Sequence, residues 1–212
     1  MINKIELKQI SFSYPNHQVF EHIDLTFSQG QRILLKGDNG SGKSTLLKII
    51  LGIIKAKSGH VINNSDFSKG FMPSSENSFF GRLTGYENLV LFSGLKKISK
   101  KDLDIQLTLW SKQFSFLKKT LNSSFFHCSS GMKKQLSVCR ALINHPQLFV
   151  ADEPFNNLDD KSMFFCTQLI NQLAENSLVL ISSHSPLPED LNISGVLDLN
   201  NKPFQIKSKK YV

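Results

Sequence analysis

One eight-residue segment restricts the possible folds of this chain more than any other feature: Gly37-Asp38-Asn39-Gly40-Ser41-Gly42-Lys43-Ser44. It fits the pattern G-x-x-x-x-G-K-[ST], and it lies between a short apolar run at 31–36 and an apolar helical pattern at 44–54. The glycines let the backbone wrap around an anion, and the following helix adds the positive end of its dipole. The segment therefore predicts a phosphate-binding loop between a strand and a helix. In such a loop Lys43 reaches the β- and γ-phosphates and the Ser44 hydroxyl ligates Mg²⁺.

A second candidate site follows the apolar run at 148–151, where two acids, Asp152 and Glu153, come at the end of a strand. Asp152 is suited to hold Mg²⁺, directly or through water, and Glu153 is suited to polarise a water aimed at a γ-phosphate. An ordinary surface turn after a core strand would have the same sequence. The phosphate loop about 110 residues upstream favours the functional interpretation.

Apolar patterning predicts the fold class. Short or alternating apolar runs predict strands at 2–12, 19–27, 31–36, 148–151 and 178–182, with a hairpin and a strand within 60–72. Helical spacing predicts helices at 44–54, within 85–126, and between the last two strands. Alternation of short apolar strands with helices is typical of a parallel sheet covered on both faces, and the middle helices predict an inserted subdomain.

Length and composition limit the alternatives. A chain of 212 residues fits one domain, alone or with an inserted subdomain. No apolar run approaches 18 residues, which argues against a membrane span. The segment 1–8 alternates like a strand and lacks an apolar signal core, so we expect a cytoplasmic protein. Cys128, Cys139 and Cys166 share no metal spacing and are interpreted as reduced thiols.

The net charge is +8, which permits an anionic partner such as a nucleotide, a membrane surface or a nucleic acid. Seven lysines against three acids at 85–126 give this segment about half of the excess. A solvated helical face explains the charge better than a docking surface does.

With these sites in place, the sequence resembles the ATP-binding subunit of ABC transporters over nearly its whole length. Residues 37–45 match the family's phosphate loop, and Asp152-Glu153-Pro154 with Asn156-Asn157-Leu158-Asp159 looks like its Walker B acids and D-loop. Ser182-Ser183-His184 looks like the switch histidine, and Tyr14 lies where the family stacks an aromatic ring on adenine.

The family's signature, usually Leu-Ser-Gly-Gly-Gln before a helix, is similar to Cys128-Ser129-Ser130-Gly131-Met132 here. Ser129 and Gly131 are retained, and in the family these donors reach the γ-phosphate held by the opposite subunit. One departure concerns the Q-loop: Ser74-Ser75-Glu76 follow Pro73, with no glutamine. Ser74 or Ser75 occupies the slot, or Glu76 substitutes as an oxygen on the Mg²⁺ side.

The resemblance implies ATP and Mg²⁺ as cofactors, Glu153 and His184 as catalytic residues, and Ser44 and Asp152 at the metal. It implies that the nucleotide is bound by residues from two subunits: Tyr14, Gly37, Asp38, Asn39, Gly40, Ser41, Gly42, Lys43, Ser44, Thr45, Ser129, Gly131 and Asp159. The implied fold is α/β: a RecA-like core of the P-loop NTPase type with an N-terminal antiparallel β-subdomain and an inserted α-helical subdomain. One domain at 1–212 then divides into a core at 1–84 and 143–212 and a helical subdomain at 85–142.

The expected function is ATP binding and hydrolysis that power an ABC transporter, an exporter, through ATP-driven dimerisation. The implied partners are a membrane-spanning permease and a second ATP-binding subunit, in a homodimer at the inner face of the cell membrane, with no nucleic acid. The segments 152–155 and 184–187 resemble haem-exporter ATPases of cytochrome c maturation, whereas the signature is as similar to drug and lipid exporters. A soluble ABC-type ATPase acting on ribosomes or nucleic acid is the alternative, disfavoured because the chain has one cassette. Another P-loop enzyme, such as a small-molecule kinase, would leave Ser129, Gly131 and His184 unexplained.

Overall fold

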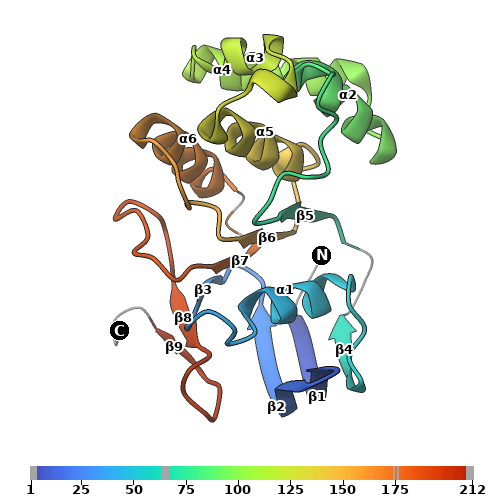
Figure 1. Cartoon of the computed structure of the whole chain (residues 1–212), viewed down its shortest axis with the longest axis vertical. Coiled ribbons are helices and arrows are strands. Elements are labelled where there is room, and N and C mark those ends of the chain that lie inside the picture. The colour runs from blue at the N-terminus through green and yellow to red at the C-terminus, as the bar shows by residue number, and fades with distance from the viewer. Residues whose placement is uncertain (1–3, 64–66, 174, 176, 209–212) are drawn as a thin grey trace.

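The computed structural model describes residues 4–63, 67–173, 175 and 177–208, and its strands form two sheets (Figure 1). The smaller sheet is antiparallel, in the order β2-β1-β4: β1 (Lys4–Tyr14), β2 (His17–Ser28) and β4 (Ser58–Asn63). The larger sheet has the order β5-β6-β7-β3-β8-β9: β3 (Arg32–Lys36), β5 (Lys69–Met72), β6 (Leu148–Asp152), β7 (Leu178–Ser182), β8 (Gly195–Asp198) and β9 (Ile206–Ser208). Neighbouring strands from β5 to β8 are parallel, and only β9 pairs antiparallel.

Burial explains why these segments are strands. In β2, Leu25 and Phe27 are buried while Thr26 between them is exposed, because this sheet packs its core on one face. Every residue of β6 and β7 is buried, as a parallel sheet covered on both faces requires. Phe149 of β6 faces one core cluster and Val150 faces the other.

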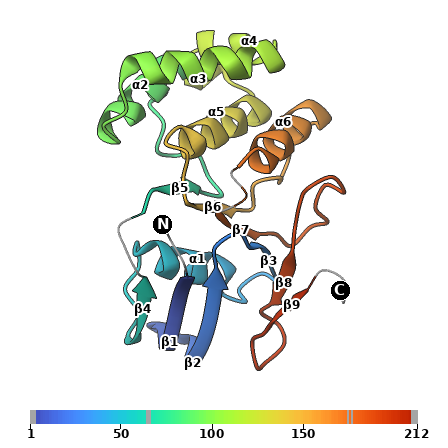
Figure 2. The same ribbon diagram turned by 180° about the vertical axis from the view of Figure 1, so that it is seen from behind.

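The two core clusters divide the molecule into layers. The helices are α1 (Lys43–Leu51), α2 (Gly85–Leu95), α3 (Lys100–Gln113), α4 (Leu117–Asn122), α5 (Ser130–Leu142) and α6 (Asp160–Asn171). Helix α1 and the antiparallel sheet share one cluster with one face of the large sheet, and α2 to α6 share the other cluster with its opposite face. Figures 1 and 2 show α2, α3 and α4 as an outer layer over α5 and α6.

The predicted sheet, its two covered faces and the middle helices are therefore present. The limits of the helical subdomain, 85 and 142, remain a prediction. No helix among the described residues has the length and apolar character needed to cross a membrane.

Two predictions about local structure between residues 44 and 72 were wrong. Residues 60–72 do not form a hairpin: β4 pairs with β1 in the small sheet, and β5 pairs with β6 in the large one. Gly70 allows β5 to lie under α5, because a Cβ there would be 2.2 Å from the carbonyl oxygen of Ala141. Helix α1 ends at Leu51 rather than at 54, where Gly52 takes the left-handed conformation at φ 77°.

The strands β8 and β9 were not expected, and Lys207 and Ser208, predicted to fray, belong to β9. These strands have four and three residues, too few for a periodic pattern. The rest of the predicted tail, 209–212, lies outside the described residues.

Strand order places both candidate sites at one edge of the large sheet. β6, β7 and β3 are adjacent and parallel, so their carboxyl ends meet at the same edge. The phosphate loop leaves the end of β3, Asp152 ends β6 and Glu153 follows it, and His184 comes shortly after β7.

Candidate functional site

The predicted phosphate loop connects β3 to α1, and Lys43 makes hydrogen bonds back to the start of the loop. Lys43 is 6% exposed, and its Nζ donates hydrogen bonds to the carbonyl oxygens of Gly37, at 2.7 Å, and Asp38, at 3.0 Å. Gly42 has φ 98°, and a Cβ there would be 2.6 Å from Val19 and 2.7 Å from Phe20. No other residue fits at 42 without strain, so the loop depends on this glycine as well as on the lysine.

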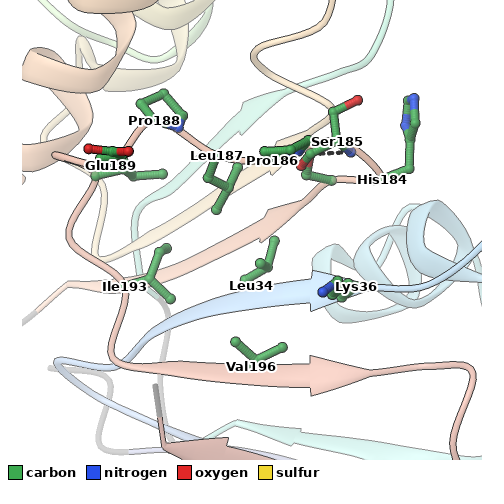
Figure 3. Close-up of a pocket in the computed structure, with 12 residues that line it drawn as sticks. Leu34, Lys36, His184, Ser185, Pro186, Leu187, Pro188, Glu189, Ile193 and Val196 are labelled. Atoms are coloured by element: carbon green, nitrogen blue, oxygen red, sulfur yellow. Dashed lines mark hydrogen bonds between the residues drawn. The ribbon is translucent and has the colours of Figure 1, made fainter. Parts of the chain in front are cut away.

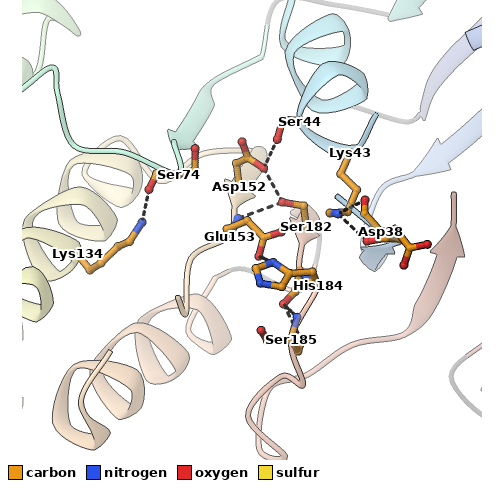
Figure 4. Close-up of polar contacts among 12 residues, drawn as sticks. Asp38, Lys43, Ser44, Ser74, Lys134, Asp152, Glu153, Ser182, His184 and Ser185 are labelled. Carbon is orange, nitrogen blue, oxygen red and sulfur yellow. Dashed lines mark hydrogen bonds and ion pairs between the residues drawn. The ribbon is translucent and has the colours of Figure 1, made fainter. Parts of the chain in front are cut away.

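A shared carboxylate links the loop to the acids after β6. The hydroxyls of Ser44 and Ser182 donate to the same oxygen of Asp152, at 2.8 and 2.7 Å (Figure 4). Asp152 is 3% exposed, and Ser182 is fully buried. Ser182 had no separate predicted role, although its place at the end of an apolar run, like that of Asp152, was an available signal.

Glu153 and His184 form a pair beside this group. His184 Nδ1 lies 3.0 Å from Glu153 Oε2, and the Glu153 side chain is 13% exposed. The Glu153 backbone has φ 51°, in the left-handed region, and its amide donates to the hydroxyl and carbonyl oxygens of Ser182. Backbone strain of this kind persists where surrounding contacts hold it, often at functional sites.

These groups surround a pocket of about 440 Å³. Nine predicted site residues line it: Tyr14, Asn39, Gly40, Gly42, Lys43, Ser44, Thr45, Glu153 and His184. Gly37, Asp38 and Ser41 belong to the same loop, and Asp152 joins the group through Ser44. At the rim, the Tyr14 hydroxyl lies 3.2 Å from Thr45 Oγ1. Four further residues that the predicted site did not include also line the pocket: His17, Val19, Ser74 and Asn156.

The turn sequence Tyr14-Pro15-Asn16 was the signal that could have placed His17 beside Tyr14, with which it pairs in the structure. Among the three candidates for the Q-loop slot, Ser74 is the one that lines the pocket. Ser75 lines a separate hollow beside α2, and Glu76 pairs with Lys134.

Three predicted residues lie together at the start of α5 rather than in the pocket lining. Ser129 caps α5, accepting a hydrogen bond from the amide of Met132 at 3.2 Å. Asp159 caps α6 through the amide of Ser162, at 2.9 Å. A Cβ on Gly131 would be 2.3 Å from Ser162 Oγ and 2.6 Å from Asp159 Oδ2, so the two helix starts are packed against each other.

His184 also borders a second pocket, of about 480 Å³, under the loop that follows β7 (Figure 3). Its walls are mostly apolar, with Leu34 and Val196 on the sheet and Leu187 in the loop. The first pocket is the candidate site because a loop of backbone amides, a buried cation and two acids meet there.

The donor set at the first pocket fits Mg²⁺ rather than a softer metal. Ser44 and Asp152 present a hydroxyl and a carboxylate, which are hard oxygen ligands. Within the described residues no three His, Cys, Asp or Glu side chains gather as a metal site. A cation here would therefore take its remaining ligands from water or from a bound phosphate.

The cysteines do not belong to this chemistry. All three are free and buried in the described structure, as predicted for reduced thiols. Burial raises the pKa of the Cys166 thiol to about 12 and raises that of Cys139 well above its usual value. Neither group forms a thiolate at neutral pH.

Comparison with known proteins gives the family. The family profile described as "ABC transporter" matches residues 20–156. The cytochrome c biogenesis ATP-binding export protein of Reclinomonas americana is 29% identical, over 96% of this chain and 95% of that protein. The zinc import ATP-binding protein of Buchnera aphidicola subsp. Schizaphis graminum is 30% identical, over 87% and 75% respectively.

A solved dimeric structure of a bacterial ABC transporter cassette has a TM-score of 0.76 with this chain. The two sequences are 23% identical, and the match covers 92% of this chain and 93% of the other. This likeness confirms the predicted fold class. The chain belongs to the ABC transporter family and is one of its ATP-hydrolysing subunits.

Proposed function

We propose that the pocket lined by Lys43, Ser44, Glu153 and His184 binds ATP with Mg²⁺ and hydrolyses it. The observation that carries this proposal is the convergence of two strand ends and a helix start on one carboxylate: Ser44 from α1 and Ser182 from β7 both bond Asp152 of β6. The convergence ties the phosphate loop to the acids at one end of the pocket, beside Glu153.

Each residue then has a defined task. The loop amides and Lys43 bind the phosphates, because charge-assisted hydrogen bonds to phosphate are stronger than neutral ones. Tyr14, 45% exposed at the rim, offers a ring face to the base. Mg²⁺, held by Ser44 and Asp152, would neutralise negative charge on the phosphates.

Hydrolysis itself needs an oriented water. Glu153 accepts a hydrogen bond from that water, whose oxygen bonds to the γ-phosphorus as the bond to the bridging oxygen breaks. ADP leaves with the electron pair of the bridging oxygen, and Glu153 takes the water's proton. His184, 3.0 Å from Glu153, holds the carboxylate in place, and its exposed ring lines the pocket, where it would donate to the γ-phosphate.

We further propose that the site is completed by a second copy of this chain. Ser129 and the first amides of α5 can donate to an anion, yet they do not line the pocket of their own chain. Asp159 lies beside them and would approach the same nucleotide. The dimeric state of the similar bacterial cassette supports a homodimer.

The proposed partner is a membrane-spanning permease, which would hold this chain at the inner face of the membrane. Similarity to a cytochrome c biogenesis export protein over almost its whole length supports export as the direction. The zinc import relative supports import as the second candidate. Export and import can be distinguished with the permease complex. The tagged chain is co-purified with its permease, and the complex is reconstituted in vesicles with the ATP-binding subunits on the outside. Stimulation of ATPase activity by solutes added on the cassette side supports export, and stimulation only from the opposite side contradicts it.

The nucleotide site is tested by Lys43→Ala. We expect ATP affinity to fall by at least about tenfold, because the loop loses its charged donor to the phosphates. Titration calorimetry measures the affinity. Lys48→Ala on the same helix is the matched control, since Lys48 does not line the pocket. Unchanged affinity in Lys43→Ala would contradict the site.

A further inference from the structure

Lys134 is a buried cation whose contacts join two parts of the proposed site. Its side chain is 6% exposed, one turn into α5. Its Nζ donates to the carbonyl oxygen of Ser74 at 3.0 Å (Figure 4). The same Nζ lies 2.8 Å from Glu76 Oε1. An ammonium loses its hydration at such a depth, so these two partners stabilise its position.

The two ends of this contact have different tasks. Ser74 lines the pocket with Lys43 and Glu153, whereas α5 begins at the capping residue Ser129. Ser74 and Lys134 are 60 residues apart in the chain. The lysine therefore connects the pocket wall after β5 directly to the helix whose first turn would face the partner's nucleotide.

At position 74, the location of the serine hydroxyl depends on the main chain more than the end of a longer side chain would. The serine hydroxyl stands one bond beyond Cβ and has a single rotatable bond, so it cannot compensate for a shift of the main chain. Lys134 bonds the Ser74 carbonyl itself and so fixes that main chain. Glu76 holds the lysine from the other side, with its own side chain 16% exposed.

The next residue anchors the same turn of α5 elsewhere. Gln135 donates to Ser162 Oγ at 3.1 Å and accepts from the Thr120 hydroxyl at 2.7 Å. Its contacts lead to α4 and to the Asp159 cap of α6, not to the pocket wall. Of these two neighbouring residues, Lys134 alone bears on Ser74.

We infer that Lys134 is a positioning residue: it holds Ser74 at the pocket in a fixed relation to the signature turn at Ser129, so that hydrolysis depends on this link. The inference rests on the proposed function and adds to it a residue that touches neither nucleotide nor water. Without the link, the pocket wall and α5 can shift separately, and displacements near 1 Å can cost up to about a hundredfold in rate.

Lys134→Met is the main test. We expect kcat to fall by about tenfold or more, while the ATP dissociation constant and KM change by less than about threefold, because the phosphate contacts lie at 37–45. Lys134→Arg keeps the charge and donors and should keep kcat within about threefold of wild type. Lys118→Met, which removes an exposed lysine of α4, is the matched control and should be unaffected.

Glu76→Gln is the second variant, and it keeps the test decisive if Lys134→Met fails to fold. It preserves shape and an acceptor for Lys134 but removes the charge, so kcat should fall, by less than in Lys134→Met. The double variant should be no slower than Lys134→Met alone, because both changes break one link. Wild-type kcat in either folded single variant overturns the inference, as does a lower melting temperature with unchanged kcat per bound nucleotide.

The two proposals fail differently. If Lys43→Ala binds ATP normally, the proposed nucleotide site is wrong. If Lys43→Ala loses ATP while folded Lys134→Met hydrolyses it at the wild-type rate, only the role of Lys134 is wrong.

Discussion

The edge of the large sheet and the start of α5 both carry predicted site residues, but they are built differently. At the sheet edge, side chains from three elements contact one another: Ser44 and Ser182 with Asp152, and Glu153 with His184. At the start of α5, Ser129 caps its own helix and Gly131 packs on α6.

The difference shows how much each region can do alone. Parallel strands bring a cation, acids and amides to one edge, and these are the groups that the proposed binding of a polyphosphate needs. A helix start offers a few amides and one hydroxyl, which can add to an anion already held on another surface. This difference is what the proposed two-copy site requires, with binding at the sheet edge and closure from α5.

The largest expected effect comes from a change at the sheet edge. Glu153→Gln should lower kcat by about 10² to 10⁴, because the water loses its base. ATP affinity should change little, since Glu153 acts on the water rather than on the bound phosphates. We expect the protein to accumulate as an ATP-stabilised dimer, measured by light scattering with and without Mg-ATP.

Glu189→Gln provides the control, since Glu189 lines the apolar pocket on the other side of His184. That variant should hydrolyse ATP at the wild-type rate. Wild-type hydrolysis in Glu153→Gln contradicts the catalytic role of Glu153. An inactive Glu153→Gln that stays monomeric at high concentration, even with the permease present, contradicts the shared site.

A smaller effect, on association alone, is expected at the start of α5. Ser129→Arg in the Glu153→Gln background should block the ATP-dependent dimer, because its bulk and charge enter only the shared interface. ATP affinity of the monomer should stay within about threefold, since Ser129 does not line the pocket. Size-exclusion chromatography with light scattering measures both species.

Ser115→Arg, an exposed position between α3 and α4, is the matched control and should still dimerise. A dimer that persists in Ser129→Arg would show that α5 does not close the site.

The sequence predicted the sheet edge well because its chemistry is local and periodic. Lys43 and Ser44 belong to one short motif between a strand and a helix, and Asp152 ends an apolar run, so parallel pairing alone brings them together. Ser182 was missed as a partner of Asp152 because the contact requires β6 and β7 to be neighbours, which spacing along the chain does not reveal.

Features that depend on distant contacts were less predictable. The sequence predicts Lys134 to be an ordinary lysine on a helix, and only the fold brings it into contact with Ser74 and Glu76. The expected hairpin within 60–72 does not form because β4 pairs with the edge of β1 in the small sheet. This pairing depends on residues far from 60–72 in the sequence. The sequence also left open which of Ser74, Ser75 and Glu76 lies in the Q-loop position. The direction of each side chain depends on the backbone conformation after β5, which the sequence does not reveal.

The smallest expected effect concerns that slot, where Ser74 meets the sheet edge. Ser74→Gln should leave ATP affinity within about threefold, because the main phosphate contacts come from 37–45 and the bond from Lys134 goes to the main chain at 74. Ser75→Gln, in the separate hollow beside α2, is the matched comparison and should bind ATP equally well. Calorimetric titration of both variants decides the point. A large loss of affinity in Ser74→Gln alone would mean that this residue itself contacts the phosphates, and the binding half of the site would then extend from the strand ends to the segment that Lys134 holds.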